Sequence, residues 1–182
     1  MKKNEITKII LGSLAIAGGL LVVVVLPGLP AAFAPFMNKG KNISRTQFKR
    51  SFDKLSDKGL IGVSKDGDKT IVRLTKSGKK KVLKFKFEDL AIKKQVKWDK
   101  KWRIVIFDIP EPYRTGRNAL AFKLRELGFV PLQKSVWIYP YPCEDEVDFV
   151  GELYEVRQFV RIITADQIDK QADVMKVFGF SE

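Results

Sequence analysis

Residues 1–38 contain a long apolar stretch, in which no charged residue occurs between positions 9 and 26. As a helix this stretch would be about 27 Å long at about 1.5 Å per residue, close to the thickness of a bilayer core. Basic residues are more numerous after it than before it, which would leave the rest of the chain in the cytoplasm. Residues 9–26 are therefore either a membrane anchor or the buried first helix of the domain that follows. A cleaved signal peptide fits less well, because the following sequence is basic and poor in cysteine.

Residues 39–90 begin with the pattern of an amphipathic helix. Ser44 and Gln47 have the spacing of a capping box, in which each side chain bonds the backbone amide of the other residue. Gly59 is suited to end the helix in a left-handed conformation. The sequence thus predicts a helix between Ser44 and Gly59. Its apolar stripe at helical spacing consists of Phe48, Phe52 and Leu55.

A β-hairpin is predicted directly after this helix. Residues 60–64 and 70–74 have strand character, and Asp66-Gly67 supplies the positive φ that a tight hairpin turn needs. A further basic helix is predicted to start near Thr75. A helix followed by a hairpin with charged strands is typical of a winged helix-turn-helix, in which the recognition helix precedes the wing.

The positive charge of the chain is concentrated in the same middle stretch. Residues 39–101 contain 21 lysines and arginines against 7 acidic residues, a net charge of +14, whereas residues 102–182 contain 10 against 13. A segment with this charge would repel itself strongly unless a polyanion neutralised it, which favours a nucleic-acid-binding module. Double-stranded DNA suits a helix and a wing. RNA binding and a merely solvated basic surface are the alternatives.

The residues expected to contact DNA are the basic ones on this helix and hairpin. Those on the helix would meet phosphates and guanine edges in the major groove, and those on the hairpin would meet the adjacent backbone. They are Arg45, Lys49, Arg50, Lys54, Lys58, Lys65, Lys69 and Arg73.

Residues 91–101 form a linker, and residues 102–182 then alternate between strand and helix patterns. The sequence predicts a strand at 103–109, a helix at 117–127, two short strands before residue 141, a helix at 145–156 and a strand at 159–166. The order βαββαβ is the ferredoxin-like pattern, a sheet with two helices on one face. A short helix is indicated after Asp169. The predicted fold class is α+β, with an N-terminal winged helix-turn-helix followed by a ferredoxin-like domain.

Three motifs in this last stretch carry a family resemblance: K-W-R-I-V-I-F-D-I-P-E, L-R-E-L-G-F and L-Q-K-S-V-W-I-Y-P-Y. They resemble the central domain of the phenylacetate-degradation repressor (PaaX-like) family, which is in turn similar to the CRISPR-associated protein 2 family. The repressor resemblance implies a homodimeric transcriptional regulator, in which the ferredoxin-like domain dimerises and the winged helices read an operator. The two-fold symmetry of such a dimer matches two half-sites about one helical turn apart.

The second resemblance implies an enzymatic alternative centred on Asp108, the acid near the end of the first strand. In the CRISPR-associated protein 2 family the matching Asp faces its symmetry mate across a dimer, and some members are Mg²⁺-dependent nucleases. Asp108 would then be catalytic and metal-binding, Ser135 would match the serine of the Q-x-S-V motif, and the chain would be an endonuclease or a spacer-integration subunit. The other interpretation is that Asp108 caps the turn before Pro110 and accepts hydrogen bonds from backbone amides.

Composition limits the remaining chemistry, because the chain has one cysteine and no histidine. Ser-His and Cys-His nucleophiles and most zinc sites are therefore excluded, and a single cysteine fits a reducing compartment. Cys143 lies at a predicted helix start, where the pKa of a thiol can fall, but without a base partner it is expected to be inert. No cofactor is predicted apart from the Mg²⁺ of the nuclease alternative.

Overall fold

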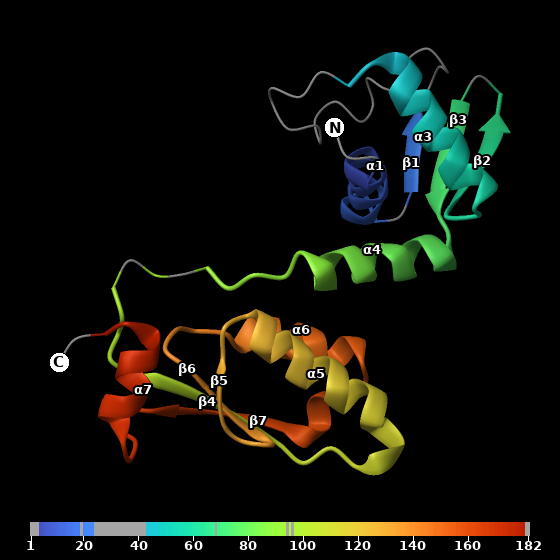
Figure 1. Cartoon of the computed structure of the whole chain (residues 1–182). Helices are drawn as coiled ribbons and strands as arrows, with labels where there is room; N and C mark the ends of the chain where they lie inside the picture. The colour runs from blue at the N-terminus through green and yellow to red at the C-terminus, as the bar shows by residue number, and fades with distance from the viewer. Residues whose placement is uncertain are drawn as a thin grey trace. The chain divides into compact units, whose positions relative to one another are not determined.

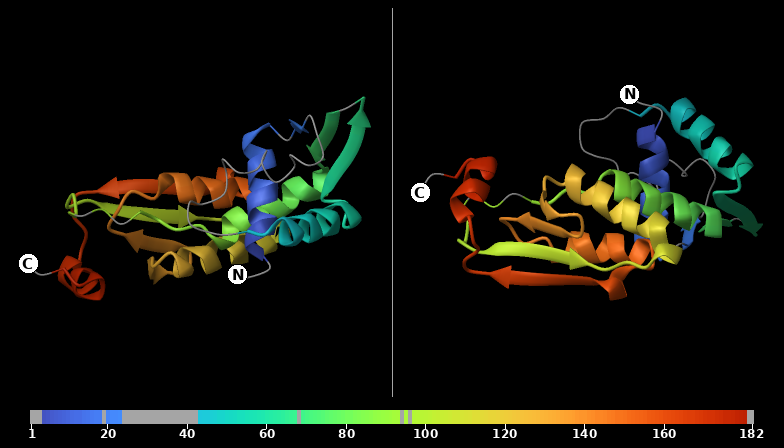
Figure 2. Two further views of the ribbon diagram at one scale, coloured as in Figure 1. Left: turned by 90° about the horizontal axis from the view of Figure 1, so that it is seen from above. Right: turned by 60° about the horizontal axis from the view of Figure 1, so that its bottom comes forward.

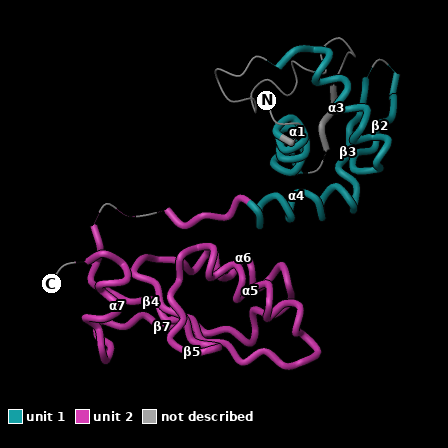
Figure 3. Tube along the Cα trace, in the orientation of Figure 1, with its two compact units in different colours: residues 1–88 teal, residues 89–182 magenta. Residues whose placement is uncertain are grey.

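The computed structural model of the chain describes residues 4–18, 20–23, 43–67, 69–93, 95 and 97–180. The chain divides into two compact units, unit 1 (Met1–Glu88) and unit 2 (Asp89–Glu182), which Figure 3 shows in different colours. Each unit combines helices with an antiparallel sheet. The predicted α+β fold class is therefore confirmed.

Unit 1 consists of helices around a three-stranded sheet with the strand order β1-β3-β2 (Figure 1). The turn between β2 and β3 contains Gly67 with φ +56°, which confirms the predicted hairpin. Ser44 caps α3 and Gly59, with φ +62°, follows its C-cap, so both predicted ends of that helix are also correct. The elements among its described residues are α1 (Asn4–Ile16), β1 (Leu20–Val23), α3 (Arg45–Asp57), β2 (Ile61–Asp66), β3 (Lys69–Leu74) and α4 (Lys76–Glu88).

A single helix over residues 9–26 is not what the structure contains. The helix ends at Ile16, Gly18 turns the chain with φ +69°, and Leu20–Val23 is a strand paired with β3. Valines are stiff at χ1 and favour strands, and glycine readily adopts the positive φ that breaks the helix. No helix in the described part of the chain is long and apolar enough to cross a membrane. Residues 24–26 lie outside the described residues.

The core of unit 1 shows what α1 does instead. Ile10, Leu11 and Leu14 are fully buried and pack with the apolar stripe of α3. Removing each of these side chains from water stabilises the unit by about 1.5–3 kcal/mol. The alternative of a buried first helix therefore describes α1. The other members of this core are Ile6, Phe48, Phe52, Leu55, Ile61, Val72, Leu74, Val82 and Phe85.

Unit 2 has the element order βαββαβ, followed by a C-terminal helix. Its sheet has the strand order β5-β6-β4-β7 with every neighbouring pair antiparallel, which is consistent with a ferredoxin-like fold. The helix predicted at residues 117–127 starts three residues earlier, because a 3-10 turn at Glu111–Tyr113 leads straight into it. The elements are β4 (Trp102–Phe107), α5 (Arg114–Glu126), β5 (Val130–Gln133), β6 (Val136–Tyr139), α6 (Glu144–Leu153), β7 (Val160–Ala165) and α7 (Gln171–Phe178).

The two faces of this sheet are covered differently. Cross-strand register places Val105 beside Trp137 on the face that α5 and α6 cover, side by side (Figures 1 and 2). On the opposite face, at the end of the sheet where β4 starts, Trp102 packs with Ile138 and with Val174 of α7. Farther along this face Ile163 is 46% exposed. Among the described residues, α7 thus covers the second face at one end only.

Candidate nucleic-acid interface

The helix α3 is held firmly at its start. The backbone N–H of Gln47 donates to Ser44 Oγ at 3.1 Å, and the N–H of Ser44 donates to Gln47 Oε1 at 3.4 Å. Both halves of the predicted capping box are therefore present. Such a cap contributes about 1 kcal/mol and satisfies two amides that would otherwise lack partners at the helix end.

One side of α3 is buried and the other carries the basic residues. The rings of Phe48 and Phe52 stack at 6.2 Å, and both lie in the core of unit 1. Arg50 and Lys54 project opposite to this stripe, given the 100° between successive residues of a helix. The acids of α3, Asp53 and Asp57, occur only in its second half. The N-terminal half thus combines exposed cations with the positive end of the helix dipole, which makes it the more electropositive end.

The hairpin presents its three basic residues on two different faces. Register pairs Lys65 with Thr70, so Lys65 lies on the same face as Val72 and therefore as the core and α3. Lys69 and Arg73 alternate with that face and project from the other side of the hairpin. The structure thus brings Lys65 to the side of α3 but does not bring the whole predicted set to one surface.

All eight predicted DNA-contacting side chains are exposed. In the described part of the chain, none of them forms an ion pair with a carboxylate. Their positive charge is therefore not neutralised by these neighbours. The prediction did not include a further group of exposed lysines, those of α4, although it placed a basic helix near Thr75.

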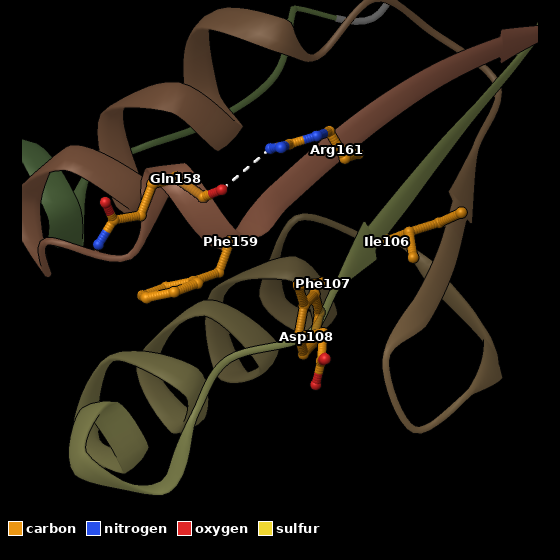
Figure 4. A pocket seen from close by; sticks show the side chains of 6 residues that line it. All are labelled: Ile106, Phe107, Asp108, Gln158, Phe159 and Arg161. Carbon is orange, nitrogen blue, oxygen red and sulfur yellow. Dashed lines mark hydrogen bonds between the residues drawn. The ribbon is translucent and has the colours of Figure 1, made fainter.

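Asp108 lies just beyond β4 and is exposed. It borders an open cavity of about 280 Å³. Figure 4 shows that the Asp108 carboxylate points away from the guanidinium of Arg161. That guanidinium donates instead to the Gln158 carbonyl at 2.9 Å. The Asp108 N–H donates to the Phe159 carbonyl at 3.2 Å. Its carboxylate accepts no hydrogen bond from any described residue, so a capping role is not observed. The cavity is lined by Ile106, Phe107, Asp108, Gln158, Phe159 and Arg161.

The surroundings of Asp108 do not fit a metal ion held by one copy of the chain. Glu111, the nearest acid in sequence, bonds Arg117 at 2.8 Å. Among the described residues, no three His, Cys, Asp or Glu side chains come together as ligands. Mg²⁺ takes about six oxygen ligands and usually keeps several waters among them, so a single exposed carboxylate holds it only weakly.

Comparison with known proteins shows which family unit 2 resembles. Residues 95–177 match the family model of the PaaX protein central Cas2-like domain. This match confirms the predicted resemblance. No curated protein matches the chain. Among solved structures, the chain is similar to Uncharacterized protein Rv0674 from Mycobacterium tuberculosis, with 19% identity and a TM-score of 0.39 over 94% of this chain and 64% of that chain. The chain thus spans less than two thirds of the length of that protein.

In the PaaX-like domain, Cys143 and the aromatic strand β6 contribute to packing. Cys143 is buried, and burial raises the pKa of its thiol to about 12, so the thiolate is strongly disfavoured at neutral pH. Burial therefore outweighs any lowering of this pKa by the helix start, which is consistent with the expectation that Cys143 is inert. Trp137 and Tyr139 are also buried, as expected for core residues. The acidic residues 144–146 form the first turn of α6, where the helix dipole favours negative charge.

Proposed function

We propose that the chain is a DNA-binding transcriptional regulator, in which unit 1 acts as a winged helix-turn-helix. The helix α3 enters the major groove and its N-terminal half, Arg45, Lys49 and Arg50, meets phosphates and base edges. Lys54 and Lys58 extend the contact along the helix, and Lys65 extends it to the β2–β3 hairpin, which acts as the wing. Lys69 and Arg73 belong to the other side of the wing and contribute to its positive field.

The distribution of charge is the observation that carries this proposal. Unit 1 contains 19 basic and 6 acidic residues, a net charge of +13, whereas unit 2 contains 15 of each. The whole net charge of the chain therefore belongs to the unit that exposes a capped basic helix next to a hairpin. The PaaX-like assignment of unit 2 independently suggests a regulator role.

The experiment measures binding of the full chain to mixed-sequence duplex DNA by fluorescence anisotropy over a series of salt concentrations. Each lysine or arginine that neutralises a phosphate contributes about −0.9 to the slope of log K against log salt. The double variant Lys49→Gln/Arg50→Gln is expected to make the slope less negative by about 1.8. Two exposed lysines of unit 2 provide a control with the same charge change, Lys134→Gln/Lys176→Gln, and this control should keep the wild-type slope.

A flat salt dependence of the wild-type protein, with only weak binding at low salt, would rule out DNA binding as the function of unit 1. Equal effects of the two double variants would show that net charge, and not the surface of α3, determines binding.

We also propose that the regulator works as a homodimer formed by unit 2. The support is the family resemblance together with the part of the sheet that α7 leaves uncovered, where Ile163 is 46% exposed and Ile106 is half-buried. Ile163→Lys is expected to convert a dimer to a monomer in sedimentation equilibrium. A wild-type protein that stays monomeric at high micromolar concentration would contradict this part of the proposal.

A further inference from the structure

The helix α4 is a second strongly basic element of unit 1. Its 13 residues include six lysines and one acid, Glu88, a net charge of +5. Its buried side is formed by Gly78, Val82 and Phe85, which pack toward the core with α1. Five of the lysines are exposed around the rest of the helix: Lys76, Lys79, Lys80, Lys84 and Lys86.

These five lysines are not paired with a carboxylate in the described part of the chain. The sixth, Lys81, differs, because it is half-buried and its ammonium lies 4.5 Å from the centre of the Phe85 ring. Lysines spaced three and four residues apart repel one another on a helix, so an external polyanion would relieve this repulsion.

The start of α4 is fixed to the end of α3. The hydroxyl of Thr75 donates to the Gly59 carbonyl at 2.6 Å and accepts from the Gly78 N–H at 3.0 Å. A Cβ added to Gly78 would lie 2.1 Å from the Leu60 carbonyl oxygen, so the helix approaches this turn as closely as only glycine allows. Lys58 at the C-cap of α3 and Lys76 at the start of α4 therefore lie on helix ends that are rigidly joined.

The chemistry of the exposed side of α4 favours phosphates over bases. All six basic residues of α4 are lysines, which act as compact point charges, whereas arginine presents a planar fork suited to bidentate contacts. Contacts with the phosphate backbone increase affinity and fix position but carry no direct sequence information. A row of lysines on a rigid helix has the properties of such a contact.

We propose that α4 is a second DNA-contacting surface, which binds the phosphate backbone of duplex DNA beside the segment read by α3. This inference rests on the proposed function of unit 1 and extends it. Affinity is divided between two helices: α3 supplies discrimination between sequences, and α4 adds salt-sensitive binding that is the same for every sequence.

The test compares the triple variant Lys76→Gln/Lys80→Gln/Lys84→Gln with the wild-type protein, again as the full chain. Its slope of log K against log salt should be less negative by about 2.7, which reduces the loss of affinity between about 50 and 200 mM salt by about 40-fold. The ratio of its affinities for two duplexes of different sequence should equal the wild-type ratio. The matched control is Lys134→Gln/Lys170→Gln/Lys176→Gln, which removes the same charge from exposed positions of unit 2.

The outcomes separate this inference from the function on which it rests. If Lys49→Gln/Arg50→Gln weakens binding while the α4 triple variant behaves like its control, unit 1 binds DNA and α4 is not part of the interface. A change in the sequence ratio would also overturn the inference, since α4 would then read bases. If the triple variant instead loses binding to anionic phospholipid vesicles with its DNA binding intact, the surface is a lipid contact. Circular dichroism and thermal melting confirm that each variant is folded.

Discussion

The two units of this chain differ in the balance between their acidic and basic residues. Unit 2 has as many acidic as basic residues, and the ion pairs found among its described residues include Arg103 with Asp99, Arg117 with Glu111 and Arg157 with Asp148. Unit 1 carries +13, and the cations of α3, of the hairpin and the exposed ones of α4 enter no ion pair with a described residue. A unit that neutralises its own charge is suited to structural work, whereas one that does not is suited to a polyanionic partner.

The units also differ in how they bury aromatic rings. In unit 2 a cluster joins the strand β4 to the C-terminal helix, with Trp98 stacked on Phe180 at 4.6 Å and Trp102 beside Phe178 at 5.9 Å. In unit 1 the core is mainly aliphatic, apart from three phenylalanines. Large rings bury the most area per residue, so we expect unit 2 to depend on single residues more strongly than unit 1 does.

The largest effect is expected for Trp102→Ala. Trp102 is completely buried, and its indole N–H donates to Gln171 Oε1 at 3.0 Å, which links β4 to α7. Truncating it should lower the free energy of unfolding of unit 2 by about 3–5 kcal/mol, measured by denaturant titration. Phe122→Ala is the matched control, because Phe122 is 55% exposed and should cost less than about 0.5 kcal/mol. Similar losses from both substitutions would contradict a core centred on Trp102.

In unit 1 two glycine-to-alanine substitutions are expected to act in opposite directions. At Gly78 the new methyl group meets the Leu60 carbonyl at 2.1 Å, and overpacking of this kind costs about 1–3 kcal/mol. At Gly12, inside α1, a Cβ meets nothing within 4 Å, so the higher helix propensity of alanine should stabilise unit 1 by about 0.5–1 kcal/mol. Thermal melting shows whether each substitution raises or lowers the melting temperature of unit 1. A stabilising Gly78→Ala would mean that α4 is not tightly joined to α3.

The sequence predicted most helices and strands because their signals are local. Ser44 with Gln47 fixes the start of α3, Asp66-Gly67 fixes the hairpin turn, and the βαββαβ order of unit 2 follows from alternating periodicities. The apolar stretch after residue 8 was harder, because hydrophobicity alone does not distinguish a long helix from a helix followed by a strand. The strand β1 exists because β3 offers it a partner, and that pairing is a tertiary contact.

The candidate site was predicted as a set of residues but not as a surface. All eight cations are exposed, as expected for positions outside the apolar stripe of α3 and along the hairpin. That Lys65 and Lys69 lie on different faces follows from strand register, which a charge count does not contain. The lysines of α4 were visible in the sequence, but only the hydrogen bonds of Thr75 show that they are joined to the end of α3.

A smaller effect is expected where unit 2 neutralises a buried cation. Asp99 accepts two hydrogen bonds from the buried Arg103 guanidinium, at 2.8 and 2.7 Å, and these bonds hold the pKa of its carboxyl below the usual value. Because the Asp99 carboxylate is about one third exposed, we expect Asp99→Asn to cost only about 1–2 kcal/mol at neutral pH.

The stabilisation contributed by the Asp99 carboxylate is expected to depend on pH. A carboxyl with a lowered pKa in the folded state stabilises the protein above its unfolded pKa of about 3.9, and the contribution disappears as the pH falls through the folded value. Urea titrations of wild type and Asp99→Asn should therefore differ at pH 7 and converge below about pH 4. A difference that stayed constant down to acid pH would exclude the charge of Asp99 as its cause.

The smallest effect is expected at Asp108, and this residue also provides the most direct test of the contrast between the two units. Its carboxylate is exposed and accepts no hydrogen bond from the described residues, so Asp108→Ala should change the free energy of unfolding by less than about 0.5 kcal/mol. Because unit 2 is not the DNA-contacting unit in our proposal, the affinity of this variant for duplex DNA and its salt dependence should match those of the wild type.

A test for nuclease activity uses the same wild-type and Asp108→Ala preparations, incubated with Mg²⁺ and with DNA or RNA. Cleavage by the wild type that disappears in Asp108→Ala, in a variant that still dimerises, would give unit 2 a phosphate partner of its own. The division of work between a charged unit that binds nucleic acid and a neutral unit that assembles would then no longer hold.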